Sequence, residues 1–210
     1  MDTIYSNRPE PMTAMVARKL SRYNIDIAAL SETRLAGTGD LAEVGAGYTF
    51  FWSGKAADEP REAGDGFAIP TVLISKLEAL PKGINDRLMT MRIPLGGSTH
   101  LILISAYVPT MTYPEEDKEQ FYQVLRDTLH SVPRNDKLLL MGDFNARTGG
   151  NSGAWPTVME PHGLGRENAN GLLLLTLCSE SASPLPTPSL SNQKSTRSLG
   201  CTHAQSTGTS

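Results

Sequence analysis

The residues with the clearest chemical potential follow an apolar stretch at positions 138–141, where the chain runs into Gly142, Asp143 and Asn145. If the extended geometry of a strand continues, Asp143 and Asn145 face the same side. A carboxylate there can orient or deprotonate a water molecule, and an amide can hold an oxyanion. The alternative is an Asx turn that closes the strand. Two polar groups on one face of a buried strand end favour a shared chemical role.

Two further apolar segments carry one polar candidate each. Residues 25–30 lead to Glu32, whose carboxylate is a suitable oxygen ligand for Mg²⁺. On spacing alone, an ion pair with Arg34 or a capping role is the commoner use of such a residue. Residues 104–108 include Tyr107, which can donate a hydrogen bond to a phosphate oxygen. Most tyrosines in this setting instead lie at the edge of the core with the hydroxyl in contact with solvent. Strand ends deliver side chains from rigid backbone into clefts, so these segments are candidates for one site.

Weaker candidates lie outside these segments. His162 is in a loop, where a histidine bonded to the backbone is commoner than one that touches a substrate, and Asn170 is a candidate helix cap. His100 and His130 are predicted to be surface residues. Four arginines could form a local positive patch around the site: Arg34, Arg87, Arg147 and Arg166.

The elements that must position these residues follow from hydrophobic periodicity. Helices are predicted at 13–23, with Thr13 as a cap, at 115–129 and at 171–178. Strands are predicted at 25–30, 47–52, 66–73, 88–93, 101–108 and 138–141, with Pro70 marking an edge or a break. Residues 149–170 are predicted to be loop-rich. Alternating strands and helices within one domain indicate the α/β class.

Length and composition exclude several classes of protein. A chain of 210 residues with 19 Lys+Arg and 22 Asp+Glu is one domain, or one domain and a tail, and does not coat nucleic acid by charge alone. Its longest apolar runs are far shorter than the roughly 18 residues of a membrane span. Cys178 and Cys201 give neither a disulfide framework nor a zinc motif, and residues 1–12 show no secretory signal. We therefore expect an intracellular protein, nuclear or cytoplasmic, without membrane or disulfide partners.

The chain divides unevenly into a body, 1–180, and a tail, 181–210. The tail is rich in Ser, Thr and Pro and has no acidic or aromatic residue, so we expect it to be disordered. Because its two charges, Lys194 and Arg197, are both positive, the body has 17 basic and 22 acidic residues and a net charge of −5. This net negative charge mildly disfavours tight binding of DNA.

Three motifs in this order resemble the endonuclease/exonuclease/phosphatase superfamily, in particular the endonuclease domains of LINE-type retrotransposons and the related craniofacial development protein 2-like proteins. They are Ser-Glu-Thr-Arg at 31–34, Ala-Tyr-Val-Pro-Thr at 106–110 and Gly-Asp-Phe-Asn-Ala at 142–146. Shorter matches at 44–48, 66–69, 85–88, 162–165 and 168–172 support them. The resemblance covers about residues 7–180, and the first and third motifs together are specific.

The resemblance implies an α/β fold in which two mixed sheets stack face to face with helices outside, as a four-layer sandwich. It implies Mg²⁺- or Mn²⁺-dependent hydrolysis of phosphodiesters in the DNA-nicking branch, with DNA as substrate. Matched residue by residue, Glu32 is similar to the metal ligand and Tyr107 to the tyrosine that supports the phosphate. Asp143 resembles the carboxylate that activates the attacking water, and Asn145 the amide beside it.

The chain also departs from the family pattern. The family opens with a strand ending in Asn and closes with a Leu-Asp-Tyr strand and an Asp-His pair, and neither motif is matched here. We therefore expect an incomplete sandwich that lacks the first and last strands, with weak or absent activity and low stability. One alternative is a catalytically inactive retroelement remnant that binds nucleic acid or a partner. A phosphatase acting on small esters is the least favoured alternative.

The tail suggests a cause for the missing motifs. In a shifted frame, the bases that encode residues 199–210 can encode Trp-Met-His-Pro-Arg-Ser-Lys-His-Trp-His-Leu, which is characteristic of the family just before the Leu-Asp-Tyr strand. We therefore expect the reading frame to slip near residues 180–185, which makes the tail an out-of-frame translation. The coding DNA tests this hypothesis.

Overall fold

The computed structural model describes residues 9–159, 165–182 and 199–203, with the backbone alone at 9–11, 182 and 199–203. The helices are α1 (Pro9–Arg22), α2 (Thr71–Ile74), α3 (Glu115–His130) and α4 (Ala169–Ala182). The strands are β1 (Ala28–Ser31), β2 (Thr38–Glu43), β3 (Tyr48–Ser53), β4 (Asp65–Pro70), β5 (Lys82–Asn85), β6 (Leu88–Gly96), β7 (Thr99–Tyr107), β8 (Lys137–Asp143) and β9 (Leu199–His203). None of the described helices combines the length and the apolar character needed to cross a membrane.

The described strands form two sheets. Sheet A has the order β1-β4-β3-β2, and all of its neighbours are antiparallel. Sheet B has the order β5-β6-β7-β8-β9, in which β7, β8 and β9 run parallel to one another. The connection from β7 to β8 passes through α3, as a parallel pair requires.

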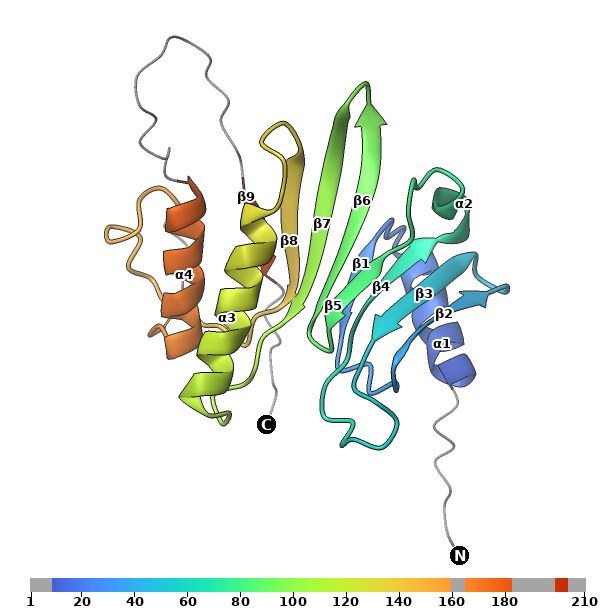
Figure 1. Cartoon of the computed structure of the whole chain (residues 1–210), viewed down its shortest axis with the longest axis horizontal. Coiled ribbons are helices and arrows are strands. Elements are labelled where there is room, and N and C mark those ends of the chain that lie inside the picture. Colours follow the sequence, from blue (N-terminus) through green and yellow to red (C-terminus); the bar gives the residue numbers. More distant parts are fainter. Residues whose placement is uncertain (1–8, 160–164, 183–198, 204–210) are drawn as a thin grey trace, which may run out of the picture.

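The two sheets are the inner layers of the molecule. Figure 1 shows α3 and α4 on the outer side of sheet B and α1 beside sheet A. Alternation along the strands decides which residues enter which layer. Met89, Met91 and Leu103 of sheet B pack against Phe51 and Phe67 of sheet A, with Ile69 in the same cluster.

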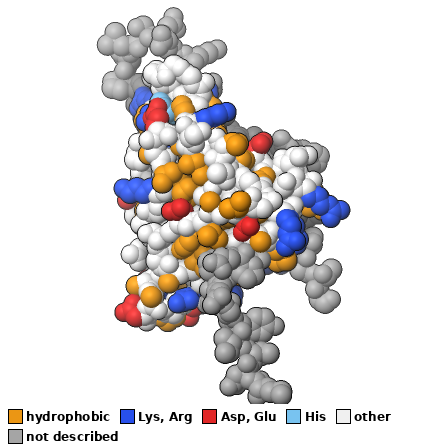
Figure 2. Space-filling view, turned by 90° about the vertical axis from the view of Figure 1, so that its right-hand side faces the viewer, with side chains coloured by type: hydrophobic (Ala, Val, Ile, Leu, Met, Phe, Trp, Pro, Cys, Tyr) orange, Lys and Arg blue, Asp and Glu red, His pale blue; other side chains and the backbone are white. Residues whose placement is uncertain are grey.

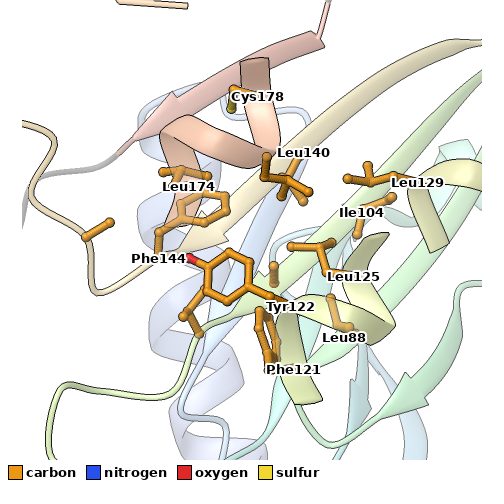
Figure 3. Packing of buried hydrophobic residues seen from close by; sticks show 14 of the residues in the cluster. Leu88, Ile104, Phe121, Tyr122, Leu125, Leu129, Leu140, Phe144, Leu174 and Cys178 are labelled. Carbon is orange, nitrogen blue, oxygen red and sulfur yellow. The ribbon is translucent and has the colours of Figure 1, made fainter. Parts of the chain in front are cut away.

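The opposite face of sheet B forms a second core with the helices. Leu88, Ile104 and Leu140 point to α3 and α4, where they pack with a set of buried side chains that includes Phe121, Tyr122, Leu125, Leu129, Leu174 and Leu177 (Figure 3). Sheet B is therefore buried on both faces. This explains why β7 and the middle of β8 read as nearly continuous apolar runs.

The predicted α/β class and the stacked two-sheet sandwich are confirmed. The predicted break at Pro70 is also found, because β4 ends there and α2 begins at Thr71. The first helix begins at Pro9 and not at the predicted cap Thr13. Thr13 is a buried residue within α1, and its hydroxyl donates to Glu43 at 3.4 Å. The strands β2 and β5 were not predicted.

Part of the tail has regular structure. Residues 199–203 form β9 beside β8, and α4 extends to Ala182. The disorder expected for 181–210 stays a prediction. The edge of β8 offers backbone hydrogen-bonding groups, and pairing with β9 satisfies them. Residues 183–198 and 204–210 lie outside the described residues, as does His162.

Candidate active site

The site is built on the parallel strands β7 and β8, which end together. Tyr107 is the last residue of β7, Asp143 is the last of β8, and the two are paired in register. The two backbones remain hydrogen-bonded just beyond the strands, because the Val108 N–H donates to the Asp143 carbonyl at 2.9 Å. Gly142 permits this close approach. Its φ is 137°, and a Cβ at this position would clash with the carbonyl oxygen of Ala106.

Glu32 reaches the same edge from the other sheet. It follows β1, and the Tyr107 hydroxyl donates to its Oε1 at 3.0 Å. Arg34 Nη2 donates to Glu32 Oε2, also at 3.0 Å, in an exposed ion pair. The ion pair with Arg34 that the sequence offered as the commoner use of Glu32 is therefore present, and its use as a metal ligand stays a prediction. The structure brings Glu32 from sheet A to Tyr107 of sheet B, beside Asp143.

Unusual backbone conformations are concentrated at these strand ends. Among the described residues, four residues other than glycine have positive φ, and three of them belong to this edge: Glu32 at 55°, Arg34 at 53° and Asn145 at 46°. This conformation is unfavourable for most L-residues by about 1–2 kcal/mol. It persists where the surrounding structure dictates it, and it is commonest at functional sites.

Arg87 holds the ring of Tyr107. Its guanidinium carbon lies 4.9 Å from the centre of the Tyr107 ring and 4.8 Å from that of Tyr113. Burial first, and then the hydrogen bond to Glu32, raise the pKa of Tyr107 to about 12, against the lowering effect of the Arg87 charge. The phenol therefore keeps its proton at neutral pH and acts as a hydrogen-bond donor.

Asp143 and Asn145 are arranged differently from the predicted continuing strand. Because β8 ends at Asp143, the chain turns, and the backbone N–H of Asn145 donates to Asp143 Oδ1 at 3.0 Å. This is the Asx-type turn that the sequence offered as the alternative. The Asn145 side chain donates through Nδ2 to the Val108 carbonyl at 2.8 Å. Asn145 therefore fixes the Asp143 carboxylate and joins the two strand ends, while Asp143 itself stays exposed.

Asn168 and Asn170 are site-supporting residues that the sequence did not reveal in these roles. The helix cap is Asn168, whose Oδ1 accepts the N–H of Gly171 at 2.8 Å, and not the predicted Asn170. Asn168 also accepts the N–H of Arg147 and donates to the Asn145 carbonyl. Two asparagines directly before an apolar run were the available signal.

Asp65 is another unpredicted residue near this edge. It is fully buried, it pairs with Ser31 in register, and its Oδ1 accepts the Ser105 hydroxyl at 2.8 Å across the two sheets. Its Oδ2 is buried without a hydrogen-bond partner in the described part of the chain. Burial raises the pKa of Asp65 well above its usual value, against the lowering effect of its hydrogen bonds. A lone acid between two glycines at the start of an apolar strand was the signal.

Glu32 is the described residue best suited to hold a divalent cation. Glu32 accepts the Tyr107 hydroxyl and Asp143 is the register partner of Tyr107, so both carboxylates lie near this tyrosine and offer the oxygen donors that hard cations prefer. The Arg34 contact is an exposed pair, a class that contributes little stability, so a cation can replace it. Within the described ranges no three His, Cys, Asp or Glu side chains form a ready metal cluster.

The predicted arginine patch is only partly formed. Arg34 is paired with Glu32, and Arg87 is buried against aromatic rings. Arg147 and Arg166 are exposed, and Arg166 lines a hollow of about 550 Å³ together with Gly149 and Gly150. The exposed positive charge therefore lies on the loops that follow β8.

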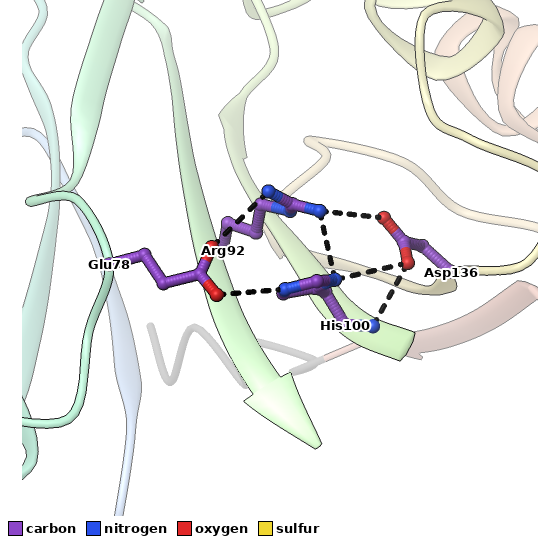
Figure 4. Close-up of polar contacts among 4 residues, drawn as sticks. All are labelled: Glu78, Arg92, His100 and Asp136. Atoms are coloured by element: carbon purple, nitrogen blue, oxygen red, sulfur yellow. Dashed lines mark hydrogen bonds and ion pairs between the residues drawn. The ribbon is translucent and has the colours of Figure 1, made fainter. Parts of the chain in front are cut away.

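His100 is a buried residue, contrary to the predicted surface position, and it is remote from the site. It lies near the start of β7, whereas Tyr107 lies at its end. Its ring contacts Glu78 at 3.2 Å and Arg92 at 2.9 Å, and its backbone N–H donates to Asp136 at 2.9 Å (Figure 4). This cluster ties the loop after α2 to sheet B. His130 is exposed, as predicted.

Comparisons with known proteins agree with this architecture. A family model described as "Endonuclease/Exonuclease/phosphatase family" matches residues 4–166. The chain is similar to craniofacial development protein 2 of Bos taurus and of Tragulus javanicus, each 28% identical over 167 residues, or 78% of this chain. These matches cover 26% and 27% of the two relatives, so the chain spans about a quarter of their length.

Two solved structures also overlap with the chain. The crystal structure of humanized D. rerio TDP2 has a TM-score of 0.45 and 14% identity, and the match covers 69% of this chain and 62% of that one. D. rerio TDP2 complexed with single strand DNA product has a TM-score of 0.44 and 13% identity, with 67% and 56% covered. Because the family model matches well over half of the residues, this chain belongs to the endonuclease/exonuclease/phosphatase family.

Proposed function

We propose that this chain carries the site of a divalent-metal-dependent phosphodiesterase that nicks DNA. The observation that supports it best is the meeting of Glu32, Tyr107 and Asp143, from two sheets, at one edge of the sandwich. Membership of the family supports hydrolysis of phosphate esters. The resemblance of the motifs at 31–34 and 142–146 to LINE-type endonucleases supports DNA as the substrate.

Each residue has a chemical role in this proposal. Glu32 would hold Mg²⁺ or Mn²⁺, and the chemistry that such a cation would supply there is polarisation of the scissile phosphate and stabilisation of the leaving oxygen. The protonated Tyr107 hydroxyl donates its one proton to Glu32 in this structure, and it would donate to a phosphate oxygen in place of Glu32 when a substrate is bound. Asp143, exposed at its strand end, accepts a proton from the attacking water. Asn145 holds one oxygen of Asp143 through its backbone N–H, so the other oxygen is left for the water.

The test is nicking of a supercoiled plasmid with Mg²⁺. Asp143→Ala removes the proton acceptor, so we expect nicking to fall about 100-fold or more. Asp40→Ala is the matched control, because Asp40 is an exposed acid on β2, away from this edge, and we expect it to nick like the unaltered chain. Chelation of the metal is expected to stop nicking. Equal nicking by Asp143→Ala and the unaltered chain would contradict the proposal.

Binding of nucleic acid without hydrolysis is the second candidate. Both oxygens of Glu32 already accept hydrogen bonds, from Tyr107 and Arg34, and the described residues contain no group of three His, Cys, Asp or Glu side chains placed to hold a metal ion. Fluorescence anisotropy with labelled DNA separates the two functions. DNA binding that is equal in Asp143→Ala and the unaltered chain, with no nicking by either, supports the second candidate. Release of phosphate from small esters would instead assign a phosphatase.

A further inference from the structure

We infer that Asn170 is a positioning residue that holds the strand ends carrying Tyr107 and Asp143 in their relative places, an inference whose catalytic meaning rests on the proposed function. Asn170 lies in the first turn of α4 and is fully buried. Its Nδ2 lies within hydrogen-bonding distance of three backbone carbonyl oxygens. These belong to Pro109 at 2.9 Å, Asn145 at 3.3 Å and Phe144 at 3.5 Å.

The three carbonyls come from two separate segments of the chain. Pro109 follows Tyr107 in the segment after β7, whereas Phe144 and Asn145 follow Asp143 directly. A side-chain amide has two N–H donors, so one group can serve both segments at once. Asn170 thus joins the backbones just beyond the two residues that the proposed chemistry needs, and it touches neither of their side chains.

Asn170 is itself anchored to the rigid part of the molecule. The hydroxyl of Tyr122, a buried core residue of α3, donates to the Asn170 carbonyl at 3.2 Å. Asn168 caps the same helix and accepts the N–H of Arg147. Because Asn170 is fixed to α3 and α4, its side-chain amide holds the loops in place and does not move with them.

Only the donor side of this amide is used. Its Oδ1 is buried and accepts no hydrogen bond from the residues that the structure describes. A buried polar atom without a partner is unfavourable, and an apolar side chain would avoid this at the same place. An asparagine with an unpaired Oδ1 makes sense at position 170 if the structure needs the two N–H donors of its side chain there.

Hydrogen exchange tests the inference without reference to activity. The N–H groups of Val108 and Asn145 both donate to Asp143 and report on the joined strand ends. In Asn170→Ala we expect both to exchange about tenfold faster relative to amides inside α4. The control is Leu177→Ala, which removes a buried core side chain of the same helix that has no polar link to these loops. It lowers overall stability, and we expect it to leave this local ratio unchanged.

A second, more conservative variant keeps the inference testable if Asn170→Ala does not fold. Tyr122→Phe keeps the ring in the core and removes only the hydroxyl that anchors Asn170, so we expect a smaller rise of the same exchange rates, about threefold. Unchanged local exchange in both variants would overturn the inference.

Kinetics separate positioning from structure. We expect Asn170→Ala to lower kcat of plasmid nicking about tenfold with KM nearly unchanged, because misplaced groups slow the reaction more than they weaken binding. Faster exchange with unchanged kcat would overturn the positioning role. If the unaltered chain does not nick, the proposed function fails, while the exchange result still decides whether Asn170 holds the two strand ends.

Discussion

At the scale of single residues, the Tyr107 hydroxyl links the two sheets at the site, because it comes from sheet B and donates to Glu32 after sheet A. Tyr107→Phe removes this bond and keeps the ring against Arg87. A hydrogen bond to a charged group is worth about 1.5–3 kcal/mol, so we expect kcat/KM of nicking to fall about 10- to 100-fold.

The pH dependence of the same variant is informative. Because the pKa of Tyr107 is raised to about 12, the phenol stays protonated throughout the neutral range. We therefore expect the pH–rate profiles of Tyr107→Phe and the unaltered chain to run parallel from about pH 6 to about pH 10. A fall in activity near pH 10 that is present only with the tyrosine would show that its pKa is not raised.

Asp65 is expected to destabilise the protein at neutral pH. Its folded-state pKa is raised above the unfolded value of 3.8, so its favourable contribution is complete below that value and is lost as pH rises through the folded-state pKa. Asp65→Asn retains an acceptor for Ser105 without the charge. We expect the free energy of unfolding at pH 7 to rise by about 1–3 kcal/mol and its pH dependence to flatten. Urea denaturation at several pH values measures both, and a lower stability at pH 7 would contradict this assignment.

The sequence predicted candidate site residues where polar groups stand at the ends of apolar strands. Glu32, Tyr107 and Asp143 were proposed in this way, and the structure brings them to one edge. The sequence analysis missed Asp65, which acts across the sheets, and named Asn170 only as a helix cap. The residues around each gave a weak local signal, but their partners are far away in the sequence, so these contacts could not be predicted.

At the scale of elements, the close pairing of β7 with β8 depends on Gly142. We expect Gly142→Ala to be destabilising by roughly 3 kcal/mol and to abolish nicking, because its Cβ meets backbone that cannot rotate away and its φ is 137°. Gly45→Ala is the matched control, since its nearest neighbour would be a side-chain atom at 3.7 Å, and we expect a nearly neutral change. Thermal denaturation measures both, and equal melting temperatures would contradict the role of Gly142.

The elements that the sequence predicted are those with long apolar runs. β7 and β8 were found because burial on both faces leaves a nearly continuous apolar run, and α3 was found because burial on one face leaves a helical period. β2 was missed because Thr38–Glu43 is short of apolar residues and alternates between exposed and half-buried positions. β5 is a four-residue edge strand, and its pairing with β6 rather than its own composition places it in the sheet.

At the scale of the whole molecule, the outer side of sheet A exposes apolar surface. Figure 2 shows hydrophobic side chains gathered between few charges on the face that carries α1. Met12 and Met15 of α1 are 57% and 51% exposed, and Val72 of α2 is 76% exposed. Exposed apolar patches favour association, so we expect the chain to self-associate as its concentration rises.

A charge on this face tests the expectation. Met15→Lys keeps a good helix former at an exposed position, so we expect less light scattering at the same concentration and an unchanged melting temperature. Glu119→Lys on α3 is the control for added positive charge elsewhere on the surface. Equal scattering by Met15→Lys and the unaltered chain would show that this face does not drive association.

Paramagnetic broadening of backbone amide NMR signals by Mn²⁺ tests whether Glu32 and Asp143 flank one site for a divalent cation. We predict that substoichiometric Mn²⁺ selectively broadens the amide signals of residues 32, 107 and 143, and that Glu32→Gln removes the effect while Glu119→Gln does not. Broadening that is absent at these three positions, or that persists unchanged in Glu32→Gln, would contradict the account.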